Sequence, residues 1–73
     1  MTTDELEVRL LKQNKHVSLD QCVLPPVAAE VLGVAEGTLK NWRSEGKGPE
    51  WVHKAQAWYR LSALVAYLNE RTK

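Results

Sequence analysis

The sequence lacks several features that would define a class of function. One cysteine, Cys22, is present among the 73 residues, so no internal disulfide can form. We expect a reducing, cytoplasmic setting in which Cys22 is a small buried apolar side chain. No run of about 18 apolar residues is present, which argues against a membrane-spanning helix. The opening residues MTTDELEVRL carry acids and no continuous apolar run, so we expect no secretory signal.

A strong excess of one charge is also missing. Ten Lys and Arg residues stand against nine Asp and Glu residues, which gives a net charge of +1. Positive charge is concentrated late in the chain, because residues 51–73 carry four bases and one acid while residues 17–50 carry three bases and five acids. A strongly basic domain would indicate nucleic-acid binding by itself. Here that function has to be argued from the placement of individual side chains.

Motifs for catalysis and metal binding are lacking as well. The sequence has no nucleophile–base motif, no phosphate-binding loop and no zinc-binding helix signature. His16 and His53 do not have the spacing from Cys22 that a zinc site requires. We therefore predict a protein that is not an enzyme and that carries no metal or other cofactor.

The pattern of apolar residues predicts one small domain that is mainly helical. Helices are expected near residues 4–14, 26–32, 35–44 and 62–71, with a two-stranded hairpin between about residues 51 and 60 that turns at Ala55-Gln56. Thr3 or Asp4 is the expected cap of the first helix, and Ser62 is the expected cap of the last. Residues 1–23 form an N-terminal helical arm with an extended segment, and residues 24–73 form the remaining unit.

The stretch LGVAEGTLKNW, residues 32–42, places Gly33 between two short helices. Glycine adopts the left-handed conformation just past a helix end at little cost. Ala29 is small enough for the two helices to cross closely. This pattern is typical of a helix-turn-helix, in which the second helix presents its outer face to the DNA major groove. The outward positions are expected to be Glu36, Gly37, Lys40, Asn41, Arg43 and Ser44.

Leu39 and Trp42, three residues apart on the second helix, are expected to be its buried pair. Their expected neighbours in the core are Val31, Leu32 and Leu64. Tryptophans can also stack on the bases of single-stranded nucleic acid. For Trp42, Trp51 and Trp58 we favour core packing, because a small domain needs large apolar side chains. Trp51, beside the loop, is the expected exception.

The segments LPPVAAEVLGVAEGTLKNWRSEGKGP and WYRLSALVAYL together resemble the excisionase and MerR-like family of winged helix-turn-helix proteins. The landmarks are Ala-Ala, Leu-Gly-Val, Thr-Leu, Trp-Arg, a Gly-x-Gly-Pro loop and Tyr-Arg, spread from Leu24 to Leu68. The resemblance implies a mainly α winged helix-turn-helix with a small two-stranded β-hairpin, here with an added N-terminal helix. It also implies DNA binding by a regulator of a phage or mobile element. Two features depart from the family: the wing segment HKAQAW has Lys54 as its only full charge, and Glu36-Gly37 stands where polar or basic residues are common.

Expected DNA contacts fall on the second helix and on the wing. Asn41 is suited to adenine, Arg43 to guanine or a phosphate, and Glu36 to the N4 amino group of cytosine. The expected recognition-helix residues are Glu36, Lys40, Asn41, Arg43 and Ser44. The expected phosphate contacts of the loop and wing are Lys47, His53, Lys54, Gln56 and Arg60.

We therefore expect a sequence-specific double-stranded DNA-binding protein: an excisionase-like recombination directionality factor or a small transcription regulator. A module this small binds weakly alone, so we expect a homodimer or a cooperative array on DNA. An integrase is the expected protein partner in excision, and no membrane partner is expected. Two alternatives remain open, namely the DNA-recognition domain of a phage terminase small subunit and a protein–protein interaction module built on a helix-turn-helix. The near-neutral charge and the amphipathic first helix favour the interaction module.

Overall fold

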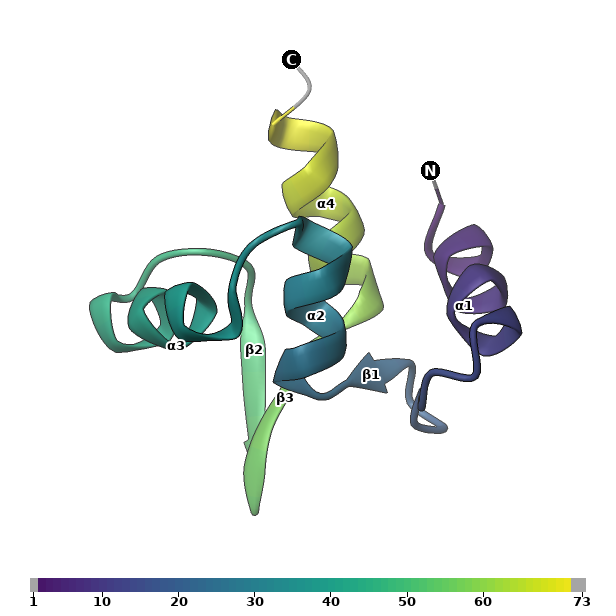
Figure 1. The fold of residues 1–73 in the computed structure, drawn as a ribbon, viewed down its shortest axis with the longest axis horizontal. Coiled ribbons are helices and arrows are strands. Elements are labelled where there is room, and N and C mark those ends of the chain that lie inside the picture. The colour runs from purple at the N-terminus through teal and green to yellow at the C-terminus, as the bar shows by residue number, and fades with distance from the viewer. Residues whose placement is uncertain (1, 72–73) are drawn as a thin grey trace.

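The computed structural model describes residues 2–71 as a mostly helical domain with a three-stranded antiparallel sheet (Figure 1). In chain order the elements are α1 (Thr3–Lys12), β1 (Cys22–Val23), α2 (Pro25–Leu32), α3 (Glu36–Glu45), β2 (Trp51–Lys54), β3 (Gln56–Arg60) and α4 (Leu61–Arg71). The four predicted helices and the hairpin are confirmed. The predicted two-stranded sheet is corrected to three strands, because the extended segment before α2 contributes β1.

Two predicted helix caps are wrong. Thr2 caps α1 in place of Thr3 or Asp4: its side-chain oxygen accepts from the Glu5 backbone N–H at 3.2 Å, and the Glu5 carboxylate accepts from the Thr2 backbone N–H at 3.2 Å. At the other end of the chain, α4 begins directly after β3, which places Ser62 inside the helix. The Leu61 backbone N–H donates to the Gln21 carbonyl at 2.9 Å. A neighbouring backbone segment therefore satisfies a donor at the start of this helix, and no serine cap is needed there.

The turn between α2 and α3 is formed as the sequence predicts. Pro25 and Pro26 occupy the first turn of α2, where a missing N–H has no helical partner. Gly33 has a φ of 72°, in the left-handed region. The Val34 N–H donates to the Ala29 carbonyl at 3.0 Å, which closes the end of α2 as a Schellman motif. α3 therefore leaves α2 at a sharp angle (Figure 1).

The sheet has the strand order β1-β3-β2, with β3 at its centre. Cys22 pairs with Arg60 on one side of β3, and Trp51 pairs with Tyr59 on the other. Ala55 alone separates β2 from β3, and it has a φ of 64°. The predicted two-residue turn Ala55-Gln56 is thus one residue too long, because Gln56 already pairs with Lys54 as the first residue of β3.

One apolar core joins the four helices with strands β1 and β3. Its buried members are Leu6, Leu10, Val23, Ala28, Ala29, Leu32, Leu39, Tyr59, Leu61, Leu64 and Val65. Leu39 is fully buried, as predicted, and Cys22 is buried as the small apolar side chain that we expected. Trp42 is only half-buried, although it packs against the same core. Tyr59, which is 1% exposed, is a core residue that was not predicted from the sequence.

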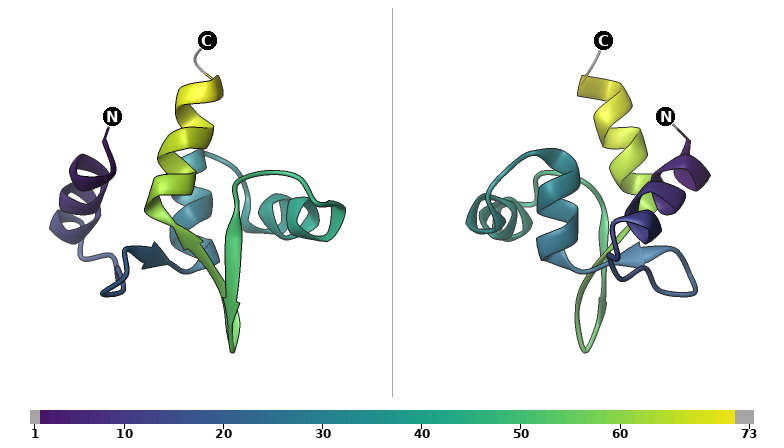
Figure 2. Two further views of the ribbon diagram at one scale, coloured as in Figure 1. Left: turned by 180° about the vertical axis from the view of Figure 1, so that it is seen from behind. Right: turned by 45° about the vertical axis from the view of Figure 1, so that its right-hand side comes forward.

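The core helices α2 and α4 stand between α1 and α3, which lie on opposite sides of the molecule (Figures 1 and 2). The β2–β3 hairpin extends away from the helices and ends at its tight turn (Figure 2). No helix within residues 2–71 has the length and apolar character required to cross a membrane.

Candidate nucleic-acid interface

The outer face of α3 is open to solvent along its whole length. Leu39 anchors the helix with no exposed surface, and Trp42 packs half-buried on the same side. The Trp42 ring meets the Tyr67 ring of α4 at a centroid distance of 5.9 Å. Seven residues of α3 are exposed, which are Glu36, Gly37, Thr38, Lys40, Asn41, Ser44 and Glu45. This division follows the helical period, so the burial of Leu39 sets which residues face outward.

Arg43 differs from the other polar residues of α3, because its side chain is half-buried against the sheet. Its Nη1 atom donates a hydrogen bond to the Tyr59 hydroxyl at 3.2 Å. Its guanidinium carbon lies 5.9 Å from the centroids of both the Trp51 ring and the Tyr59 ring. Cations are attracted to aromatic faces at this distance. Arg43 thus fastens α3 to both strands of the hairpin, and its donor groups are partly engaged within the protein.

The loop after α3 is shaped by Trp42. The Lys47 N–H donates to the Trp42 carbonyl at 2.7 Å, and Gly46 ends the helix with a φ of 72°. Gly48 has a φ of 82°, and a Cβ atom at that position would come within 2.9 Å of Trp42 Cε3. The glycine is therefore required by both backbone conformation and space. The exposed Lys47 ammonium lies 3.8 Å from the Glu45 carboxylate, a loose surface pair.

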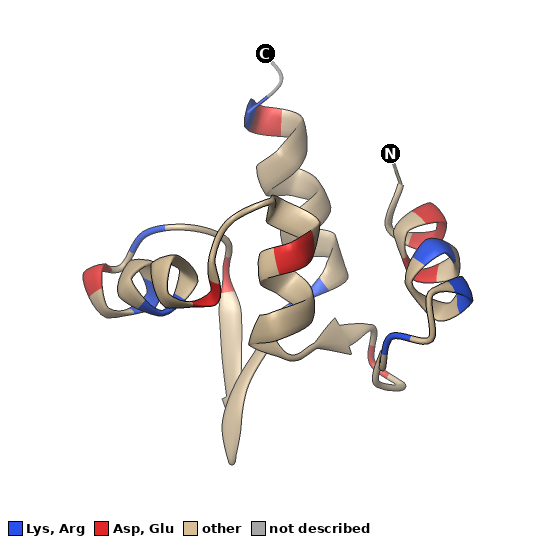
Figure 3. Cartoon of the chain, viewed as in Figure 1, with Lys and Arg blue, Asp and Glu red and all other residues tan. Residues whose placement is uncertain are grey.

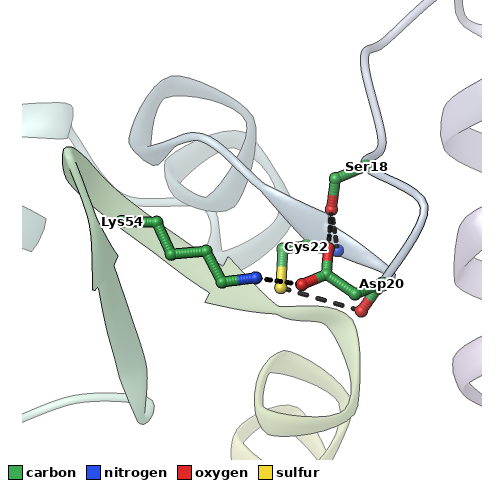
Figure 4. A network of polar contacts seen from close by, with 4 residues as sticks. All are labelled: Ser18, Asp20, Cys22 and Lys54. Atoms are coloured by element: carbon green, nitrogen blue, oxygen red, sulfur yellow. Dashed lines mark hydrogen bonds and ion pairs between the residues drawn. The ribbon is translucent and has the colours of Figure 1, made fainter.

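The hairpin carries three of the predicted contact residues on its surface: His53, Lys54 and Gln56 are all exposed. The His53 ring lies 6.5 Å from the Trp51 ring, edge to face. Lys54 is not free, because its ammonium forms an ion pair with Asp20 in the turn before β1 (Figure 4). The Lys54 charge, which was expected to contact phosphate, is thus paired within the chain.

Asp20 is held by two groups. Besides Lys54, the Ser18 hydroxyl donates to its carboxylate, and the Ser18 oxygen in turn accepts from the Cys22 backbone N–H at 2.9 Å (Figure 4). These hydrogen bonds, that of Lys54 first and that of Ser18 second, lower the Asp20 pKa from 3.8 to about 2. The Asp20 hydrogen bond raises the Lys54 pKa above its ordinary value of 10.5. Both groups are therefore charged over the whole physiological pH range.

Arg60, the last predicted contact residue, is exposed at the end of β3. It lines a surface hollow together with Asp20, Gln21 and Ser62. The hollow lies beside the Asp20 turn, so Arg60 and Lys54 both border the same acidic residue. Asp20 is the residue of this surface that sequence reasoning missed, since a pair separated by 34 positions has no local signal.

The predicted residues therefore form an exposed set on α3 and a second set on the hairpin, with Arg43 between them. Acidic and basic residues are interspersed over the molecule (Figure 3). Within residues 2–71, no group of three or more His, Cys, Asp or Glu side chains is placed to hold a metal ion. No protein-family model, no curated protein and no solved structure matches this chain.

Proposed function

We propose that this protein binds double-stranded DNA in a sequence-specific manner through a winged helix-turn-helix. In this proposal α2 and α3 are the two helices of the motif, α3 is the recognition helix and the β2–β3 hairpin is the wing. The observation that carries the proposal is the outer face of α3, where Lys40, Asn41 and Ser44 are exposed opposite a fully buried Leu39. A helix held by its apolar side and open on its polar side can enter a major groove.

The exposed residues of α3 have distinct roles in this proposal. Asn41 reads adenine, because its amide can donate to N7 and accept from N6 at once. Glu36 accepts from the N4 amino group of cytosine, and Lys40 and Ser44 contact guanine or the phosphates. Arg43 keeps its predicted place at the interface in a changed role. It sets the angle between α3 and the hairpin through Tyr59, and its remaining N–H groups face phosphate.

The hairpin contributes less charge than its sequence suggests. Lys54 is paired with Asp20, so His53, Gln56 and Arg60 supply the wing contacts. Lys47 in the preceding loop adds a positive charge that is only loosely paired. Each phosphate contact of this kind adds to affinity without selecting a sequence. Selectivity then rests on α3, mainly on Asn41.

A role in a phage or mobile element fits this small module, as the resemblance to excisionases and MerR-like proteins implies. Such a protein would act as a recombination directionality factor beside an integrase, or as a small transcription regulator. One recognition helix covers a short site, so binding in pairs or arrays would be required for useful affinity. A protein-interaction module is the second candidate, favoured by the exposed Val8 and Leu11 of α1.

Selection of duplexes from a random library, followed by fluorescence anisotropy at two salt concentrations, tests the proposal. We expect one enriched sequence whose affinity falls steeply with salt, because bound phosphates release counterions. The Lys40→Ala/Asn41→Ala double variant should lose the preference for this sequence. Arg9→Ala, which removes one positive charge from α1 on the far side, is the matched control and should retain the preference. Absence of salt-dependent binding to any duplex by the wild type would overturn the proposal and favour the interaction module.

A further inference from the structure

α1 buries one face and leaves the opposite face open. Leu6 and Leu10 are 2% and 3% exposed, whereas Val8 and Leu11 are 50% and 53% exposed. Val8 also lines an open surface hollow, whose other residues all belong to α1 or directly follow it: Asp4, Glu5, Arg9, Lys12 and Gln13. Within residues 2–71, about half of the surface of Val8 and of Leu11 is left uncovered. An exposed apolar face opposite a buried one indicates that the helix packs against a second partner.

The charges on this outer face have a definite order. Asp4 and Lys12 each lie four residues from Val8, one on either side, so all three share a face. α1 begins with acidic residues and ends with basic ones (Figure 3). Asp4 accepts one long hydrogen bond of 3.4 Å from Gln21, and Lys12 forms no ion pair with any of residues 2–71. The face is thus acidic, apolar and basic in sequence along the helix.

We propose that this face, defined by Asp4, Val8, Leu11 and Lys12, is the interface of a homodimer in which two α1 helices pack antiparallel. A two-fold axis beside Val8 brings each Asp4 to the level of Lys12 in the second copy, and it places the two Val8 side chains together at the centre. The same surface therefore complements itself. A parallel pair would set Asp4 against Asp4 and Lys12 against Lys12, which like-charge repulsion opposes.

The dimer leaves the α3 face free, since α1 and α3 lie on opposite sides of the molecule (Figures 1 and 2). α1 has 10 residues and is therefore about 15 Å long, so one face of it buries less than the roughly 1,200 Å² of a stable interface. The dimer is weak in free solution. The dimer proposal does not rest on DNA binding, so either proposal can be wrong while the other holds.

Sedimentation equilibrium of the full chain without DNA tests the interface. We expect the wild type to approach the dimer mass as its concentration rises to about 1 mM. Asp4→Lys and Lys12→Asp should each weaken self-association by roughly tenfold or more, because every attraction across the two-fold becomes a repulsion. An equimolar mixture of these two variants should associate again, since each chain then complements the other.

Two controls separate the interface from general effects of charge and folding. Glu45→Lys makes the same change of charge on α3 as Asp4→Lys makes on α1, and it should self-associate like the wild type. Circular dichroism should show an unchanged helix content in all variants. A wild type that stays monomeric at about 1 mM would overturn the proposal. So would a mixture that associates no more than its components, or a Glu45→Lys variant as weak as Asp4→Lys.

Discussion

Arg43 of α3 and Tyr59 of β3, 16 residues apart in the sequence, are joined by a hydrogen bond of 3.2 Å between Nη1 and the phenol oxygen. Tyr59 is 1% exposed, so its position is fixed by the core. The same residue that fills the core therefore holds the guanidinium and, through it, the orientation of α3 relative to the hairpin. The angle of the proposed recognition helix depends on the sheet as well as on the Gly33 turn.

Tyr59→Phe tests this link, because it removes the acceptor and keeps the ring. We expect a loss of about 0.5–1.5 kcal/mol in the free energy of unfolding, the usual worth of one hydrogen bond. Urea denaturation measures this loss. Tyr67→Phe, which removes a hydroxyl from a half-buried ring on α4, is the matched control. Equal stability of Tyr59→Phe and the wild type would show that the bond does not secure α3.

Gly48→Ala should destabilise the protein more than Gly46→Ala. Both glycines have positive φ values, 82° and 72°, so alanine at either costs about 1–2 kcal/mol in backbone conformation. Only at Gly48 would the new Cβ meet Trp42 Cε3, at 2.9 Å, which adds about 1–3 kcal/mol of overpacking. Urea denaturation of both variants gives the difference. In a Trp42→Ala background the difference should disappear, and a difference that persists there would point to another cause.

Asp20→Asn should strengthen binding to random duplex DNA. The substitution frees the Lys54 ammonium from its ion pair, so one more phosphate can be neutralised and the slope of log affinity against log salt should steepen by about 0.9. Fluorescence anisotropy at several salt concentrations measures this slope. Glu7→Gln makes the same change in net charge on α1 and should leave the slope as in the wild type. If both variants behave alike, release of Lys54 is not the cause.

The Asp20 carboxyl should titrate at a pH of about 2, because the Lys54 and Ser18 hydrogen bonds hold its pKa below the ordinary 3.8. A pKa that is lower in the folded state stabilises the fold above the unfolded value. This contribution is therefore present above about pH 4 and is lost as the pH falls towards 2. Side-chain carboxyl NMR measures the midpoint. In Lys54→Ala the midpoint should move up towards 3.8, and a wild-type midpoint already at 3.8 would contradict the ion pair.

Asn41→Ala and Lys40→Ala should weaken DNA binding in different ways. A base contact carries sequence information, so Asn41→Ala should cost about 1–3 kcal/mol on the selected site and little on a scrambled one. A phosphate contact carries no sequence information, so Lys40→Ala should weaken binding to both duplexes equally and reduce the salt slope by about 1. Anisotropy on the two duplexes separates these outcomes. An equal loss on both duplexes for Asn41→Ala would remove it from base reading.

The parts of the fold that depend on local signals could be predicted from the sequence. Gly33 marks a left-handed helix end, and the spacing of Leu61, Leu64 and Val65 marks one apolar helix face. The extended conformation before α2 was predicted, but its pairing as β1 could not be recognised, because two residues are too short for a periodic pattern. Its existence depends on β3, which lies more than 30 residues later and offers a free edge. The start of α4 was misplaced for the same reason, since Gln21 satisfies the N–H of Leu61.

The same distinction applies to the candidate site. The exposure of Lys40 and Asn41 follows from the helical period once Leu39 is known to be inside. The engagement of Arg43 with Tyr59 and of Lys54 with Asp20 could not be foreseen, because each pair joins distant segments. Sequence patterns thus indicate which side of a helix faces solvent. Whether a charge on that surface is free depends on the tertiary fold.

The pairing of β1 with β3 and the packing of Leu6 and Leu10 into the common core have a consequence for the order of folding. Within this chain, α1 and β1 leave the ribosome before their main packing partners, α4 and β3. A nascent chain that ends before β3 has no strand for β1 and no α4 to cover α1. The domain should therefore reach its native state only after α4 has been made, in one cooperative step.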